Sequence, residues 1–348
     1  PRAQALVLAA GAGLGHPWLG VCLSVAMMCT AVSWMLQGWF PPGWALLGGM
    51  LAVLRFATTG YWINSYMGGA VAATGGALIL GALPRLMRTF HPGHALLMGF
   101  GLILLANSRP WEGLVLSLPV AGVLGKGLLG SRRPSARTRM LRVVLPISIL
   151  LGLAGVAMGY YFWSVTGSPV RMPYQVGREA YATAPIFLWQ SPRAEPVHHH
   201  PVIREFFRRY EQEFYETETR SVRSLLTTKA AFTIALVAFY FGPALLLPLL
   251  MFPYLLRDKR IRFLVAAGAV GLVGLMVEVG FIPHYAAPMT ALFLALVVQG
   301  LRHLRVWRWH GRPAGVLLVR SVPLVYASAL VLRLLAPPLG LPVAVTDF

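Results

Sequence analysis

Residues 143–165 read VVLPISILLGLAGVAMGYYFWSV and contain no charged side chain. A helix rises about 1.5 Å per residue, so a run of this length can cross the roughly 30 Å hydrocarbon core of a bilayer. Further apolar runs follow along the chain, separated by short Arg-rich clusters. This pattern is typical of a membrane protein with many spans, and it predicts an all-α fold.

The composition excludes most classes of soluble protein. Hydrophobic residues make up 57% of the 348 residues and charged residues only 12%, whereas soluble domains carry about a quarter. The net charge of +19 reflects the scarcity of acids, 11 in all, so basic residues at membrane edges explain it and no nucleic-acid partner is expected. Cys22 and Cys29 lie in one apolar run and are expected to be buried thiols.

We expect an all-α integral membrane protein with about ten membrane helices and one long extracytoplasmic loop. Three regions follow from this: membrane helices over 1–165, the loop over 166–228, and membrane helices over 229–348. The run at 94–108 is short, so it is either tilted or a helix that ends inside the protein. The ten predicted spans are 17–38, 43–59, 62–83, 94–108, 112–130, 143–165, 229–255, 263–281, 284–301 and 314–336.

The orientation follows from four basic connectors. Counting spans between them places all four on one side of the membrane, which the positive-inside rule makes cytoplasmic. Together they hold 15 of the 30 Lys and Arg residues and a single acid, Asp258. Their basic residues are Arg85 and Arg88; Arg132, Arg133, Arg137, Arg139 and Arg142; Arg257, Lys259, Arg260 and Arg262; and Arg302, Arg305, Arg308 and Arg312.

The connector 166–228 then lies outside and contains seven of the 11 acids. Its first half carries five prolines and is expected to be irregular. Its second half is expected to be an amphipathic helix, because apolar residues recur at helical spacing. The loop is either a lid over a substrate site or a solvated ectodomain. The residues of that helical pattern are Ile203, Phe206, Phe207, Tyr210 and Phe214.

Ionisable residues within apolar runs are costly and are functional candidates by default. The sharpest case is Asn107-Ser108-Arg109-Pro110-Trp111-Glu112-Gly113, where Pro110 predicts a break between two helices. Arg109 could bind a phosphate through its planar fork of donors. Alternatively, Arg109 and Glu112 form an ion pair that caps two short helices. Arg55, Lys126, Glu278, Arg320 and Arg333 are the further ionisable residues of this kind.

Two further clusters carry polar groups at the outer edge. Residues 278–288 bring His284 and Tyr285 to the start of a span, where His284 could contact a phosphate and an aromatic belt is the alternative. Residues 61–69 contain Tyr61 and Asn64, which could bind a sugar or belong to the same belt. The glycines at 68, 69, 75 and 76 are expected to allow close helix packing rather than to bind phosphate.

No metal site is expected. His198, His199 and His200 are adjacent, but no Cys or Asp stands nearby and neighbouring side chains of a loop point in different directions. The chain has two aspartates, Asp258 and Asp347, so there is no Asp-rich site for a metal-bound nucleotide.

The run Ser-Arg-Pro-Trp-Glu-Gly at 108–113 resembles the Arg-Pro-Glu-Gly signature of type C (GT-C) membrane glycosyltransferases, such as the protein O-mannosyltransferases and aminoarabinose transferases. Trp111 is an insertion in that pattern. The His-Tyr-Ala-Ala-Pro run at 284–288 is similar to the Tyr-Leu-Leu-Pro entry to a late helix in these families. Residues 1–6 resemble the end of their "pro-pro-x-x-x-leu" segment.

The resemblance implies transfer of a sugar from a polyprenyl-phosphate donor to an acceptor on the outer face, by inverting displacement. It places the catalytic acid in a first outer loop, which would lie before Pro1, so the chain is expected to be truncated and its catalytic residue stays unassigned. The partners implied are the lipid-linked donor and membrane lipid. No cofactor is assigned, and a divalent metal is left open. The substrate-binding candidates are Arg109, Glu112, His284, Tyr285, Tyr61 and Asn64.

Two other classes of function stay open. A transporter or flippase of a lipid-linked or anionic substrate would use the same charged residues for passage, although no internal repeat supports it. A subunit that scaffolds partners through the outer loop is the third. Arg outnumbers Lys by 27 to 3, which points to a GC-rich bacterial genome and therefore to a bacterial inner membrane.

Overall fold

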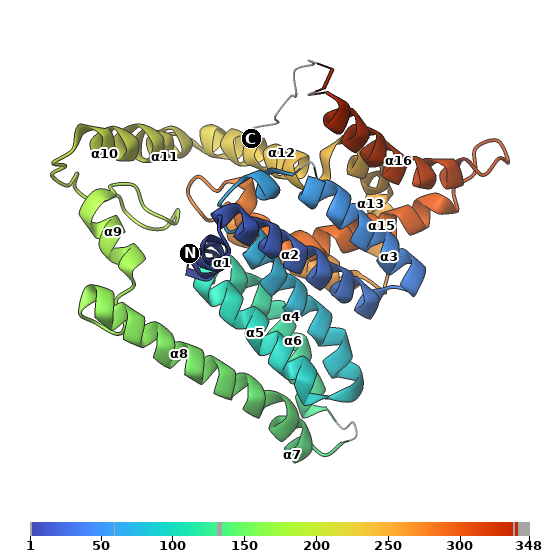
Figure 1. Cartoon of the computed structure of the whole chain (residues 1–348), viewed down its shortest axis with the longest axis horizontal. Helices are drawn as coiled ribbons and strands as arrows, with labels where there is room; N and C mark the ends of the chain where they lie inside the picture. Colours follow the sequence, from blue (N-terminus) through green and yellow to red (C-terminus); the bar gives the residue numbers. More distant parts are fainter. Residues whose placement is uncertain (1, 59, 131–133, 337, 340–348) are drawn as a thin grey trace.

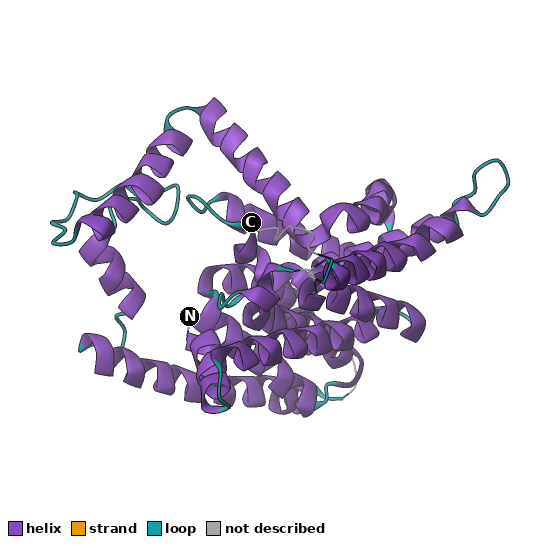
Figure 2. Cartoon of the chain, turned by 45° about the horizontal axis from the view of Figure 1, so that its top comes forward, coloured by secondary structure: helices purple, strands orange, loops and turns teal. Residues whose placement is uncertain are grey.

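The computed structural model describes residues 2–58, 60–130, 134–336 and 338–339. Helix accounts for 81% of the structure. The described residues form no strand, only two isolated bridges, Phe187 to Glu278 and Trp309 to Arg312. Figure 2 shows helices joined by loops, so the expected all-α fold is confirmed.

The first half of the chain builds a helical bundle in which α4 packs against both α2 and α5 (Figure 1). Its elements are α1 (Arg2–Gly13), α2 (Pro17–Trp39), α3 (Pro42–Ala52), η1 (Val53–Thr58), η2 (Tyr61–Asn64), α4 (Gly69–Thr89), α5 (Pro92–Ser108), α6 (Pro110–Leu129), α7 (Ala136–Arg139), η3 (Met140–Val144) and α8 (Leu145–Thr166).

The second half adds the outer segment and then returns to the bundle, where α15 packs against α4, α3 and α2. Its elements are α9 (Pro173–Tyr181), α10 (Pro201–Glu205), η4 (Phe206–Gln212), α11 (Glu213–Thr219), α12 (Val222–Leu246), η5 (Leu247–Met251), α13 (Phe252–Arg257), α14 (Arg262–Met276), η6 (Pro283–Met289), α15 (Thr290–Arg305) and α16 (Ala314–Leu335).

Among the described residues, eight helical segments are long and apolar enough to cross a membrane, which defines a multi-pass membrane protein. Two of the ten predicted spans, 94–108 and 263–281, coincide with α5 and α14, which have 17 and 15 residues. The count of ten spans therefore stays a prediction. The eight segments are Pro17–Trp39, Pro42–Asn64, Gly69–Thr89, Pro110–Leu129, Ala136–Thr166, Val222–Arg257, Pro283–Arg305 and Ala314–Leu335.

Prolines begin several of these helices. Pro17 and Pro92 lie in the first turn of α2 and α5, where the missing N–H would have no partner anyway. In both cases the preceding histidine caps the helix: Nδ1 of His16 accepts from the Trp18 N–H and Nδ1 of His91 from the Gly93 N–H, each at 3.1 Å. Proline and histidine thus set these helix starts together.

The glycines of 68–76 are packing residues, as the sequence indicates. A Cβ at Gly76 of α4 would lie 1.8 Å from the carbonyl oxygen of Pro288 in η6, and a Cβ at Gly69 would lie 2.2 Å from the ring of Trp62. Neither position has room for a side chain. The backbones of α4 and η6 are therefore in direct contact in the core.

The helix α12 is broken inside the membrane at Gly242, whose φ is +55°, and Pro243. Proline has no N–H, so Pro243 leaves the carbonyl of Phe239 without its regular helical donor. Arg55 Nη2 donates to this carbonyl instead, and also to the carbonyl of Ala238 at 3.3 Å. Arg55, one of the ionisable candidates, therefore holds the broken helix.

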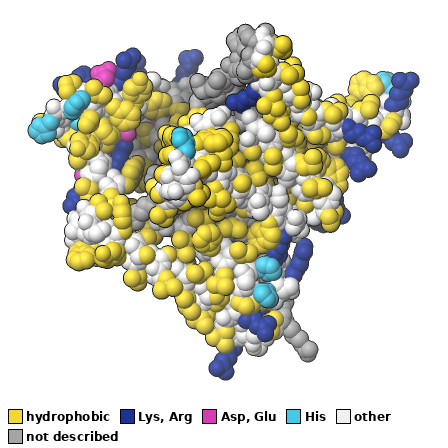
Figure 3. Space-filling view, in the orientation of Figure 1, with side chains coloured by type: hydrophobic (Ala, Val, Ile, Leu, Met, Phe, Trp, Pro, Cys, Tyr) yellow, Lys and Arg dark blue, Asp and Glu magenta, His cyan; other side chains and the backbone are white. Residues whose placement is uncertain are grey.

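The basic connectors meet at one end of the bundle, around the turn between α2 and α3. Figure 3 shows Lys and Arg gathered along the lower and right edges of the face drawn, while its middle is largely hydrophobic. The contacts that join the connectors are Arg88 to the Gly38 carbonyl (3.4 Å), Trp39 on Phe263 (5.9 Å between ring centroids), Arg302 over Phe40 (5.9 Å), Arg305 over Trp44 (5.9 Å) and Arg139 over Phe90 (5.7 Å).

The segment 167–221 forms an arch between α8 and α12 (Figure 1). Residues 182–200 form no helix, as predicted for the first half, but α9 precedes them with Pro173 in its first turn, a favourable position for proline. The predicted second helix is present as α10, η4 and α11, which follow without a break. Its apolar face is not buried, since Phe206 and Tyr210 are 50% and 67% exposed.

Candidate functional site

The site is built on the break between α5 and α6. Arg109 separates the two helices with φ −139° and ψ 75°, and Pro110 begins α6. A residue before proline avoids the helical region, so the local sequence imposes this break. The break places the Arg109 side chain at the end of the bundle that lies away from the basic connectors.

Arg109 contacts both an acid and an aromatic ring. Its Nη1 lies 3.4 Å from Oε1 of Glu112, and its guanidinium carbon lies 3.9 Å from the ring centre of Tyr285. The Arg109 side chain is 22% exposed and that of Glu112 is 7% exposed. The stacked ring fixes the plane of the guanidinium, and the long contact to Glu112 engages one of its nitrogens.

The segment 278–288 meets the helix break at 107–113 here. Pro283 begins η6, and the ring of His284 lies 5.4 Å from that of Tyr285, edge to face. Arg109 is close enough to His284 for their charges to interact. The structure therefore brings together four of the predicted residues, Arg109, Glu112, His284 and Tyr285.

An aromatic cluster covers the start of α6. Trp111 packs edge to face on Phe187 at 4.7 Å, and Phe187 stacks on Trp189 at 4.6 Å. The indole Nε1 of Trp111 donates to the carbonyl of Gly274 at 3.0 Å. Trp111, which departs from the glycosyltransferase signature, thus joins α6, α14 and the outer segment.

The outer segment is attached beside the site through its backbone. The Leu188 N–H donates to the carbonyl of Val277 at 3.0 Å, and the Val279 N–H donates to that of Ile186 at 2.9 Å. Further out, Arg178 of α9 pairs with Glu211 at 2.5 Å and donates to the carbonyl of Ala184. Residues 184–189 are therefore held over the loop that precedes η6.

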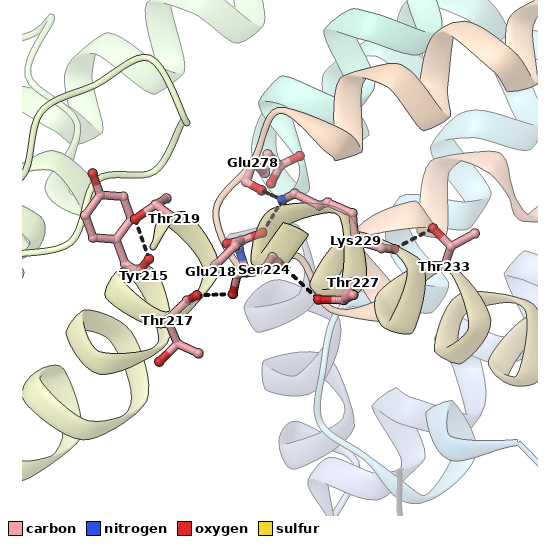
Figure 4. Close-up of polar contacts among 10 residues, drawn as sticks. Tyr215, Thr217, Glu218, Thr219, Ser224, Thr227, Lys229, Thr233 and Glu278 are labelled. Atoms are coloured by element: carbon pink, nitrogen blue, oxygen red, sulfur yellow. Dashed lines mark hydrogen bonds and ion pairs between the residues drawn. The ribbon is translucent and has the colours of Figure 1, made fainter. Parts of the chain in front are cut away.

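A buried ion pair connects the same loop to α11 and α12 (Figure 4). Nζ of Lys229 lies 2.7 Å from Oε1 of Glu218 and donates to the backbone carbonyl of Glu278. Oε2 of Glu218 accepts from the Gly280 N–H at 3.1 Å. The Glu278 side chain is itself buried and lies within electrostatic reach of Arg109, Glu112 and Lys229.

No local sequence pattern marks Glu218 or Lys229 as a site residue. Glu218 is one acid among seven in a loop, and Lys229 stands at the start of a predicted span, where a snorkelling lysine is ordinary. The one usable signal was rarity, because the chain has three lysines. Their pairing depends on the fold of the arch, which no local pattern encodes.

Tyr61 and Asn64 lie in η2 and show no contact with Arg109 among the described residues. The Tyr61 ring packs edge to face on Phe239 at 6.3 Å, and Asn64 is exposed. Trp62, between them, is buried against Phe56 and Tyr240. This segment therefore contributes to the core first, and a sugar-binding role for Tyr61 and Asn64 stays a prediction.

The histidine run shows packing contacts. The ring of His198 lies beside those of Tyr181 and Phe207, at 6.3 and 6.2 Å between centroids, and these two rings stack on each other at 5.9 Å. Within the described part of the chain, no three His, Cys, Asp or Glu side chains gather in a way that could hold a metal ion.

Comparison of the chain with protein-family models, with curated proteins and with solved structures finds no match. The chemistry of the site therefore has to come from its own groups. These are a partly exposed guanidinium, a buried carboxylate beside it, a histidine and a tyrosine, under a cover of aromatic rings.

Proposed function

We propose that the protein is a membrane glycosyltransferase that moves a sugar from a polyprenyl-phosphate donor to an acceptor at the outer face of the membrane. The observation that carries the proposal is the Arg109 guanidinium, held at a helix break by Tyr285 and Glu112. A phosphate is the ligand that its planar, bidentate donor geometry fits best.

The donor nitrogens of Arg109 support this role. Apart from the 3.4 Å contact with Glu112, its side chain makes no hydrogen bond to another described residue. Glu112 is buried and holds one side of the fork, while the other side is accessible. A lipid phosphate arriving from the membrane edge would complete the pairing of this cation.

The neighbouring rings suit the sugar and the lipid. Trp111, Phe187 and Trp189 present apolar faces that can pack on a sugar ring or an isoprenoid chain. His284 lies beside Tyr285 and is the second candidate for contact with the phosphate. The arch 167–221 would cover the bound donor and exclude water.

The reaction would be a single displacement. The acceptor hydroxyl gives its proton to a base, its oxygen bonds to the anomeric carbon, and the bond from that carbon to the phosphate oxygen breaks. The lipid phosphate leaves with the electron pair, where Arg109 stabilises its charge. We assign Glu112 to the positioning of Arg109, since it is buried against that side chain, and we assign no residue as the base.

The test uses the protein expressed from its complete gene. We would measure binding of undecaprenyl phosphate to the detergent-purified protein, and transfer from radiolabelled polyprenyl-phosphate sugars in proteoliposomes. Arg109→Gln removes a charged hydrogen bond, so its dissociation constant for undecaprenyl phosphate should rise about tenfold or more. Arg320→Gln, which removes an exposed charge from α16, is the matched control and should bind like the wild type.

Three results would contradict the proposal. Equal binding by Arg109→Gln and wild type removes the phosphate role of Arg109. Movement of the labelled donor across the bilayer without loss of its sugar indicates a transporter or flippase instead. Absence of both binding and transfer for every donor tried leaves the scaffold function.

A further inference from the structure

The basic end of the molecule contains a pocket of about 610 Å³, far from the Arg109 site. It lies between the end of α13, the connector that follows it and the last turns of α15. The charged and titratable side chains that line it are Arg257, Asp258, Lys259, Arg260, Arg302 and His303. Four cations therefore face a single carboxylate.

That carboxylate is already engaged. Oδ1 of Asp258 accepts from the backbone N–H of Arg260 at 2.9 Å. Oδ2 lies 3.1 Å from Nε2 of His303 and accepts from the side-chain amide of Gln299. Asp258 thus organises the connector, and its single negative charge cannot balance the four cations around it.

Gln299 links Asp258 to Arg302 through hydrogen bonds. Its amide oxygen accepts from Nη1 of Arg302 at 2.9 Å, while its amide nitrogen donates to Asp258. Arg302 also lies over the ring of Phe40, 5.9 Å from its centre. The guanidinium is therefore oriented by a neutral partner and keeps its full charge for a ligand.

The other cations have no acidic partner. Arg257, Lys259 and Arg260 are exposed, and none lies within ion-pair distance of a carboxylate in the described part of the chain. Cations that crowd one pocket repel one another, so a multivalent anion would stabilise the arrangement. Phosphate offers the required charge and several acceptor oxygens.

We propose that this pocket binds a phosphate group. One source is the headgroup of an anionic membrane lipid, since basic pockets at the cytoplasmic ends of membrane helices suit such headgroups. The apolar side chains next to the pocket favour this source: Tyr254 is 58% exposed and Leu256 is 52% exposed, so both are available to acyl chains. A small soluble phosphate shares the same chemistry.

The test measures binding by the detergent-purified, full-length protein. The probes are a short-chain phosphatidylglycerol, the matching phosphatidylcholine, inorganic phosphate and pyrophosphate, each titrated against the thermal unfolding midpoint. The pocket variant is Arg257→Gln/Arg260→Gln, two exposed positions that should fold normally. The control is Arg308→Gln/Arg312→Gln, which removes the same charge from exposed positions of the neighbouring connector, outside the pocket.

We expect a saturable rise of the midpoint with phosphatidylglycerol and none with phosphatidylcholine. The apparent dissociation constant should increase at least about tenfold in the pocket variant and stay unchanged in the control. If pyrophosphate or phosphate shows this pattern and the lipid does not, the site is a phosphate site with a soluble ligand. Equal loss in both variants, or no saturable effect of any phosphate probe, would overturn the proposal.

Discussion

Arg55 and Arg109 look alike as residues, since each is an arginine within a largely apolar stretch. Their surroundings separate them. Arg55 donates to the carbonyl of Phe239, which Pro243 leaves without a helical donor, and to that of Ala238, so its role is structural. Arg109 has a ring and one carboxylate beside it, which leaves donors for a ligand. A buried charge is therefore interpreted from its partners, which can lie almost two hundred residues away.

Asp258 gives a residue-scale prediction of pH dependence. Burial by itself would raise its pKa, but hydrogen bonds from the Arg260 N–H, His303 and Gln299 favour the charged form and lower the pKa below its ordinary value. On acidification the unfolded chain therefore takes up the proton first. The stabilisation is present above the ordinary pKa of about 3.8 and is lost as the pH falls through the folded-state value.

Asp258→Asn should accordingly lower stability at pH 7 by about 1 kcal/mol, because it removes charge-assisted hydrogen bonds. The difference in stability between Asp258→Asn and wild type should become smaller as the pH falls below about 4. Thermal unfolding of both proteins in phosphate-free detergent buffer between pH 7 and pH 3 measures the difference at pH 7 and its change with pH. A difference that stays constant over this range would show that the charge of Asp258 does not contribute.

At the scale of elements, the positions of prolines predict where helices begin, but a high proline content does not predict that a segment lacks helices. Pro17 begins a helix at the first residue of a predicted span, and Pro92 and Pro110 begin helices two residues before predicted spans. Pro173 begins α9 in a segment predicted to be irregular. The prediction rested on the number of prolines, whereas a single proline in the first turn of a helix is favourable. Local sequence thus fixes helix starts better than it excludes helices.

The ion pair between Glu218 and Lys229 ties α11 to α12, and its loss is an element-scale prediction. Lys229→Met leaves a buried carboxylate unpaired and should cost about 3–5 kcal/mol of unfolding free energy. The double variant Glu218→Gln/Lys229→Met should recover part of that loss, since the Glu218 carboxylate is then removed together with its partner. Denaturant unfolding of the solubilised protein gives all three values.

Arg171→Met is the matched control, because its pair with Glu179 is about half exposed on both sides. Exposed pairs contribute about 0–1 kcal/mol, so this variant should stay close to wild type. If Lys229→Met were equally mild, the joint between α11 and α12 would have to be held by packing alone.

At the scale of the whole molecule, the all-helical membrane fold follows from apolar run length, and four of the site residues follow from their local motifs. The contact between these residues does not follow from the sequence, because Arg109 and Tyr285 are far apart along the chain and only the tertiary fold stacks them. The two short helices α5 and α14 show the same limit, since composition cannot say whether a 15-residue helix spans the bilayer.

The gathering of the basic connectors at one end predicts the orientation of the molecule. In a background with Cys22→Ser and Cys29→Ala, Val197→Cys should react with an impermeant maleimide on intact cells, because it lies in the exposed arch. His310→Cys, in the exposed connector before α16, should react only after permeabilisation. The opposite pattern would invert the orientation and place the Arg109 site in the cytoplasm.

The contact of Gly76 with Pro288 has a consequence for biosynthesis. Because α4 leaves the ribosome roughly 200 residues before η6, translation at about 5–20 residues per second separates them by on the order of ten to forty seconds. During that interval the glycine surface of α4 faces lipid or an insertion chaperone, because η6 has not yet been synthesised. The contact between α4 and η6 therefore forms late in synthesis, and a nascent chain that ends after α12 still lacks the segment that packs on Gly76.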